Sequence, residues 1–206
     1  IMDSERISEM ARHINNGALR LYRLLENFLL YAQTEIVLSD RHQIDVFRSR
    51  YCLSPKTIIT HYATKQAQQS KRDESLHLNL EDAHSVAISE ELLKKIIEEL
   101  IDNACKFSAE TTQIEVKSWV EGENLVVSVM NRGRGMTHEQ IAKIGAYMQF
   151  ERRIYEQQGA GLGLIICQRL MEIHAGTFEI ESVPNETTTV TMKLPLMQGI
   201  DAPKST

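Results

Sequence analysis

The segment SEELLKKIIEELIDNACKF, residues 89–107, decides the fold because it predicts a helix with two unlike faces. It opens with serine, a favoured N-cap residue, and continues with apolar residues at helical spacing. These apolar residues form one buried side: Leu93, Ile96, Ile97, Leu100, Ile101 and Ala104. Glu99 and Asn103 lie four residues apart and Lys106 follows three later, so their side chains share another face.

This polar face has two interpretations. It is either a solvated surface with ordinary charge pairs, which are common on helices, or the wall of a ligand site. In the second interpretation Asn103 offers an oxygen to magnesium and Lys106 contacts phosphate, while Glu99 accepts or polarises the proton of an attacking group. The rest of the sequence has to decide between them.

Strand and helix patterns surround this helix and predict an α+β fold. A serine–proline pair at Ser54 and Pro55 marks the start of a helix, and another helix ends near His174. Two alternating runs form a hairpin through Gly122. The expected strands are LHLNL (76–80), SVAI (85–88), TQIEVKSWVEG (112–122), NLVVSVMN (124–131), TFEIESV (177–183) and TTVTMKLPL (188–196). We therefore expect a two-layer α/β sandwich, with helices on a mainly antiparallel mixed sheet.

The N-terminal segment, residues 4 to about 34, has apolar residues at helical spacing and no proline, which predicts one long amphipathic helix. Such a helix needs a partner helix, in the same chain or in a second copy, to bury its apolar stripe. A helical dimerisation stalk is the simplest interpretation. The segment LSDRHQIDVFRSRY, residues 38–51, then connects it to the rest of the chain.

Composition excludes several classes of protein. The chain has 206 residues, a net charge of −5 and 42% hydrophobic residues. Acidic charge argues against a nucleic-acid surface, and no apolar run reaches the roughly 20 residues that a membrane span needs. Three cysteines without a C-x-x-C pair suggest neither a disulfide framework nor a zinc site. We therefore expect a cytoplasmic protein.

Two glycine-rich segments decide in favour of a ligand site. NRGRGM, residues 131–136, follows a predicted strand, and GAGLGL, residues 159–164, precedes a predicted helix. Glycines after a strand allow a sharp turn and a close approach to a flat ligand. Glycines before a helix expose its N–H groups and positive end to phosphate oxygens. The second segment is not a Walker loop, because no Lys-Ser or Lys-Thr follows it.

In this order, EELIDNACKFS, NRGRGM and GAGLGL resemble the N, G1 and G2 boxes of the ATP-binding domain of sensor histidine kinases. MQFER, residues 148–152, resembles the F box that precedes their lid, and the resemblance spans about residues 76–196. The segment IGAYMQFER, residues 144–152, is similar to the corresponding segment of bacterial kinases that join a receiver domain to the kinase core. ALRLYRLLENFLLYAQTE, residues 18–35, resembles the second helix of their dimerisation and phosphotransfer domain.

The resemblance implies a Bergerat-type fold with a long dimerisation helix in front of it, and a site for ATP and Mg²⁺. It implies that Asn103 binds the magnesium, that Lys106 contacts the phosphates and that Phe107 lies against the adenine. The glycine boxes would line the pocket through Gly133, Gly135, Gly159, Gly161, Leu162 and Gly163. The lid would carry Phe150 and two arginines of which one reaches the terminal phosphate, Arg152 and Arg153.

This sequence departs from the family pattern at two points. Asn131 replaces the aspartate that accepts a hydrogen bond from the adenine amino group, so we expect ATP binding to be weaker by roughly 1 to 2 kcal/mol. The phosphoacceptor box, with its HELR-like sequence, does not occur in this chain. His13 is the only histidine on the body of the long helix, and we expect a surface or dimer-seam position for it. The chain as given is therefore not expected to phosphorylate itself.

The leading hypothesis is the catalytic ATP-binding region of a two-component histidine kinase. Residues 1–50 would be part of the dimerisation and phosphotransfer domain, 51–197 the ATP-binding domain and 198–206 a tail. Its partners would be ATP, the receiver domain of a response regulator and a second copy of the chain. Two alternatives stay open: an ATPase of the same pocket type with Glu99 as general base, and a dimerising regulatory module whose pocket Asn131 has impaired.

Overall fold

The computed structural model describes residues 4–83, 85–142, 144 and 162–197. Its centre is a five-stranded sheet in the order β1-β2-β3-β5-β4. The parallel pair is β1 (Leu76–Leu80) with β2 (Ile114–Glu121), and every other neighbouring pair is antiparallel. The remaining strands are β3 (Asn124–Arg132), β4 (Thr177–Val183) and β5 (Thr187–Pro195).

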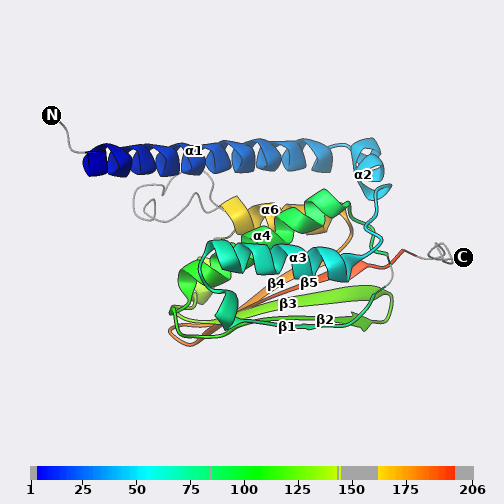
Figure 1. Cartoon of the computed structure of the whole chain (residues 1–206). Helices are drawn as coiled ribbons and strands as arrows, with labels where there is room; N and C mark the ends of the chain where they lie inside the picture. Colours follow the sequence, from blue (N-terminus) through cyan, green and yellow to red (C-terminus); the bar gives the residue numbers. More distant parts are fainter. Residues whose placement is uncertain (1–3, 84, 143, 145–161, 198–206) are drawn as a thin grey trace, which may run out of the picture.

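Three helices cover one face of this sheet, and the core lies between the two layers (Figure 1). They are α3 (Pro55–Gln69), α4 (Glu90–Phe107) and α6 (Leu162–Ile173). The predicted apolar side of α4 is buried throughout, and alternate residues of β2, β3 and β5 face it. The α+β prediction, with helices on a mainly antiparallel mixed sheet, is confirmed.

The predicted hairpin between β2 and β3 is confirmed, and it turns at Gly122 with a φ of 59°. The SVAI segment was wrongly expected to be a strand, because Val86 makes only isolated bridges, to Cys52 and to Leu196. Val86 and Ile88 are fully buried all the same, since the segment lies between Cys52, which precedes α3, and Leu196, which follows β5. The segment is apolar and buried like a core strand, but it pairs with its neighbours only through single bridges, so its sequence pattern alone does not distinguish it from a strand.

The long N-terminal helix, α1 (Ser4–Leu38), lies across the helix layer as a separate rod (Figure 1). Its last third is attached: Leu30 and Tyr31 pack against the core, and Thr34 and Val37 are buried. Most of its earlier apolar residues are exposed, among them Ile7, Met10, Ile14, Leu21, Leu25 and Phe28. The helix is therefore anchored near its carboxyl end, and its apolar stripe is uncovered over the rest of its length.

The connecting segment after α1 contains a further helix, α2 (Arg41–Arg48), for which no form was predicted. Asp40 caps it by accepting a hydrogen bond from the His42 N–H at 2.9 Å. Arg48 then donates to the carbonyl of Ile173, the last residue of α6, at 2.6 Å. Short helices η1 (Asp73–Ser75) and α5 (His138–Ala142) complete the described elements. Within the described residues no helix combines the length and hydropathy needed to cross a bilayer.

Candidate functional site

The polar face of α4 meets the start of α6, and Gly163 is the point of contact. A Cβ built on Gly163 would lie 2.1 Å from Oε2 of Glu99 and 3.6 Å from Nδ2 of Asn103. The glycine of the second box, the carboxylate and the amide of the first box are therefore direct neighbours. Because α6 begins at Leu162, its first turn, whose N–H groups have no partner within the helix, lies beside these two side chains.

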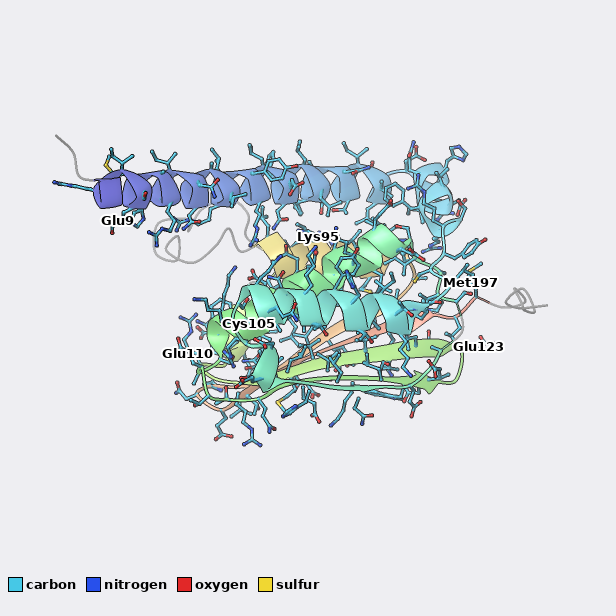
Figure 2. The ribbon with its side chains drawn as sticks, in the orientation of Figure 1. Glu9, Lys95, Cys105, Glu110, Glu123 and Met197 are labelled. Carbon is cyan, nitrogen blue, oxygen red and sulfur yellow. The ribbon has the colours of Figure 1, made fainter. Side chains whose placement is uncertain are left out.

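Glu99 is held by two donors on one of its oxygens. Nζ of Lys95 donates to Oε1 at 2.6 Å from one turn earlier in α4, and Nδ2 of Asn27 in α1 donates to the same atom at 3.2 Å. Lys95 projects from α4 into the space below α1 (Figure 2). The other oxygen, Oε2, is the atom that faces Gly163. The carboxylate is thus oriented, with one oxygen fixed and the other turned to the glycine segment.

Asn27 is the site residue that the sequence analysis missed. It lies in the helix assigned to dimerisation, 72 positions before Glu99, and no local pattern distinguishes it from the polar residues around it. Its Oδ1 atom is buried, and no described residue pairs with it. A second contact joins α1 to α6, because Nε of Arg169 in α6 donates to Oε1 of Glu35 in α1 at 2.7 Å. Helix α1 is therefore coupled to both walls of the site.

Lys106 does not join the Glu99 and Asn103 pair in this structure. Its ammonium group pairs with Asp102, one turn earlier in α4. The other oxygen of Asp102 accepts a hydrogen bond from Gln66 of α3 at 3.3 Å. Lys106 is exposed, and its contact with a phosphate remains a prediction. The contact requires the side chain to leave Asp102 and adopt a different conformation.

The first glycine segment, residues 131–136, lies against the carboxyl end of α4. A Cβ on Gly133 would lie 1.9 Å from the carbonyl oxygen of Phe107, and the N–H of Arg134 donates to that same oxygen at 3.1 Å. Gly135 has a φ of +64°, and a Cβ there would lie 2.4 Å from the carbonyl oxygen of Val183. The protein's own backbone thus explains why these positions are glycine, and their contact with a ligand remains a prediction.

Phe107 forms part of an open cavity of about 950 Å³ at this end of α4. Its ring is 37% exposed and lies 5.3 Å from the guanidinium carbon of Arg134, a cation–π distance. The cavity is basic, because Lys106, Arg132 and Arg134 line it together with a single acidic residue, Glu186. An exposed aromatic ring beside cationic groups is compatible with the predicted contact between Phe107 and a nucleotide base.

A buried arginine, which the sequence analysis also missed, fixes the loop that follows α4. Arg72 is 6% exposed and donates to the carbonyl of Thr112 at 2.8 Å and to Oγ of Ser108 at 3.0 Å. It also donates to the carbonyl of Cys105 at 3.4 Å. The bond to Cys105 satisfies a carbonyl at the end of α4, and the bonds to Ser108 and Thr112 hold the loop that follows Phe107.

Asn131 lies at the end of β3, on the face of the sheet that carries the core. It is paired in register between Ile114 of β2 and Thr188 of β5. Its side chain is 6% exposed, and its Nδ2 atom is buried without a hydrogen-bond partner in the described part of the chain. A buried amide of this kind is unusual, because nearly all buried polar atoms have partners.

The other predicted residues are placed as follows. Phe150, Arg152, Arg153, Gly159 and Gly161 lie outside the described residues, whereas Leu162 is buried at the start of α6. His13 is exposed on α1, with Nε2 3.8 Å from Oε1 of Glu9.

The cysteines are free and show no sign of reactivity. Burial raises the pKa of the Cys52 thiol to about 11, and burial also raises the pKa values of Cys105 and Cys167. Thiols with raised pKa values are poor nucleophiles at neutral pH. Cys105 is only partly buried, whereas Cys52 and Cys167 are buried.

Comparison with known proteins agrees with this geometry. Residues 88–198, more than half of the chain, match the family described as histidine kinase-, DNA gyrase B-, and HSP90-like ATPase. The adaptive-response sensory kinase SasA of Crocosphaera subtropica is 27% identical over 84% of this chain and 44% of its own length. The non-motile and phage-resistance protein of Caulobacter vibrioides is 33% identical over 50% of this chain and 13% of its own length. The chain thus spans less than half of either relative.

Two solved structures share the fold. Histidine kinase AdeS of Acinetobacter baumannii matches with a TM-score of 0.67 and 17% identity, over 95% of this chain and 86% of that one. The catalytic domain of histidine kinase ThkA matches with a TM-score of 0.56 and 22% identity, over 68% of this chain and 91% of that one. By its family match, its fold and its relatives, the chain belongs to the family of histidine kinase-, DNA gyrase B- and HSP90-like ATPases, as the ATPase domain of sensor histidine kinases does.

Proposed function

We propose that this chain is the catalytic ATP-binding region of a two-component histidine kinase. Residues 51–197 form the ATP-binding domain, and residues 1–50 are part of the dimerisation and phosphotransfer domain. In the complete kinase, the γ-phosphoryl group of ATP passes to a histidine outside this chain and then to the receiver domain of a response regulator. The observation that supports this most strongly is the contact of Gly163 with Glu99 and Asn103.

That contact gathers the groups that a magnesium-bound triphosphate needs. The N–H groups of the first turn of α6 have no partner within the helix and suit phosphate oxygens, and glycine at 163 places no side chain over them. Oδ1 of Asn103 suits Mg²⁺, which prefers a few protein oxygens together with phosphate oxygens. When bound, the ion neutralises negative charge on the phosphates.

Glu99 is the residue that we assign to the proton of the attacking group. Lys95 and Asn27 occupy Oε1, so the carboxylate cannot rotate freely, and Oε2 points to the start of α6. A base must lie within hydrogen-bond reach of the proton that it accepts, and a fixed orientation favours this. The lid arginines Arg152 and Arg153 remain candidates for contact with the terminal phosphate.

Labelled ATP and magnesium, given to a longer chain that includes the upstream helix, test the proposal. We expect acid-labile, base-stable label on the protein, which identifies phosphohistidine. Glu99→Gln and Asn103→Asp should each reduce labelling at least tenfold, whereas Glu98→Gln, the matched change one position earlier in α4, should leave it intact. Tight ATP binding without any such label would contradict the kinase assignment.

One observation favours a second candidate, an ATPase with the same type of pocket. The oriented carboxylate of Glu99 four residues before Asn103 is also suited to activating water. Steady-state release of inorganic phosphate distinguishes the two functions. Hydrolysis that disappears in Glu99→Gln and requires no histidine anywhere in the protein would favour the ATPase.

The proposed homodimer uses the uncovered stripe of α1. Leu21, Leu25 and Phe28 are 59%, 51% and 48% exposed, and long amphipathic helices are stabilised by burying such a stripe against a partner. Sedimentation of Leu25→Glu should show a loss of dimer, and Arg23→Glu, a change on the same helix outside this stripe, should not.

A further inference from the structure

Asn131 carries hydrogen-bonding capacity that no described residue uses. It is 94% buried, since its relative exposure is 6%, and Nδ2 is buried with no partner among the residues that the structure describes. Leaving such an atom unpaired is unfavourable, which indicates that a bound group normally pairs with it.

The neighbouring side chains show which hydrogen-bonding groups the end of the sheet still offers. Oγ of Ser182 donates its one proton to the carbonyl of Thr187 at 2.8 Å. The 2.8 Å contact between the Ser182 and Thr188 hydroxyls is therefore donated by Thr188. Ser182 also accepts from the N–H of Met136 at 2.8 Å. Among these three polar side chains, only Asn131 retains a proton to donate.

An amide and a carboxylate differ in what they recognise. A carboxylate offers acceptors alone, whereas an amide places a donor beside an acceptor. The edge of a 6-aminopurine has an amino donor beside the N1 acceptor, and the edge of a 6-oxopurine has a carbonyl acceptor beside the N1–H donor. An asparagine side chain matches either edge by turning over its amide. A carboxylate would face the 6-oxo carbonyl with another acceptor and be repelled.

We propose that Asn131 relaxes the base specificity of the site, so that it binds 6-oxopurine triphosphates as well as ATP. This inference rests on the proposed function, because it requires the base to lie at the end of β3. It concerns a specificity-determining residue: the amide weakens the contact with the adenine amino group and provides a donor for the 6-oxo group.

Titration calorimetry with inosine triphosphate and ATP, each with magnesium, tests the inference. Inosine triphosphate is the probe because it differs from ATP only at the 6-position and N1. We expect the two dissociation constants of the unmodified chain to agree within about tenfold, and Asn131→Asp to widen their ratio by a further tenfold to a hundredfold, about the effect of an unpaired buried acceptor. Asn124→Asp, the same change at the opposite end of β3, is the control and should leave the ratio unchanged.

A third nucleotide gives a test that requires no variant, in case Asn131→Asp does not fold. Purine riboside triphosphate has N1 but no group at position 6, so it should bind about tenfold more weakly than ATP or inosine triphosphate to the unmodified chain. If ATP binds and inosine triphosphate does not, or if purine riboside triphosphate binds as tightly as both, the inference is wrong and the proposed function stands. If no purine triphosphate binds, the proposed function fails together with it.

Discussion

The two glycine segments border the same helix, but they have different neighbours. At the end of β3, Gly133 and Gly135 lie against main-chain oxygens of Phe107 and Val183, whereas at the start of α6, Gly163 lies against the side chains of Glu99 and Asn103. Main-chain atoms inside a helix end or a strand cannot move without disturbing the fold, and a side chain can. We therefore expect glycine to be required for folding at the first segment and for the proposed ATP site at the second.

Gly133→Ala should have the largest effect on stability. The new methyl group would meet the carbonyl oxygen of Phe107 at 1.9 Å and Cα of Ser108 at 2.7 Å, so β3 and α4 must separate. We expect the free energy of unfolding to fall by about 2–4 kcal/mol, measured by urea denaturation. Gly17→Ala is the matched control, because nothing lies within 4 Å of that position in α1, and it should stabilise the chain slightly.

Gly135→Ala should have the next largest effect, for two reasons that can be separated. Its φ of +64° is unfavourable for alanine, and the methyl group would also lie 2.4 Å from the Val183 carbonyl oxygen. Gly122 has a φ of +59° with nothing within 4 Å, so Gly122→Ala reports the backbone term alone, about 1 kcal/mol. We expect Gly135→Ala to lower the free energy of unfolding by about 1–2 kcal/mol more than that. Equal losses in the two variants would show that the close contact is unimportant.

Gly163→Ala should separate stability from function. The neighbour at 2.1 Å is the end of the Glu99 side chain, which can move aside by giving up its hydrogen bonds to Lys95 and Asn27, so the free energy of unfolding should fall by only about 1 kcal/mol. Displaced Glu99 and a covered helix start should weaken ATP binding about tenfold, provided that the proposed function holds. Calorimetric titration and urea denaturation of the same sample measure both quantities. A loss of stability as large as that of Gly133→Ala would remove the distinction between the segments.

The far end of α6 offers the smallest effect, one that depends on pH. Burial lowers the pKa of His174 below its ordinary value of 6.5, against the opposing effect of its hydrogen bond to the Leu170 carbonyl. The unfolded chain therefore takes up a proton that the folded chain does not, and stability should fall as pH drops below about 6.5, by at most about 1.4 kcal/mol per pH unit. Urea denaturation between pH 7.5 and 5.5 measures this slope. His174→Gln should reduce it, and an unchanged slope would assign the effect to other groups.

Much of this architecture could be predicted because its causes are local. The apolar spacing of α4, its Ser89 cap and the alternation in β2 and β3 each act within one element, and the structure agrees with them. The contacts of Asn27 and Arg72 could not be predicted, since each joins residues more than 30 positions apart and neither residue belongs to a periodic pattern. The pairing of Lys106 with Asp102 was missed for another reason, because helical spacing permits several partners and packing selects one.

Helix α1 resembles a cantilever: its carboxyl-terminal part, from about Asn27 onward, is attached to the helix layer, and its amino-terminal part projects freely from that attachment. The projecting part, at 1.5 Å per residue, is about 35 Å long. A tilt of about 5° at the attachment would displace its free end by roughly 3 Å over that length. Because Asn27 joins this attachment to the Glu99 carboxylate, we expect a small shift of that carboxylate to produce a larger displacement at the distant end of α1.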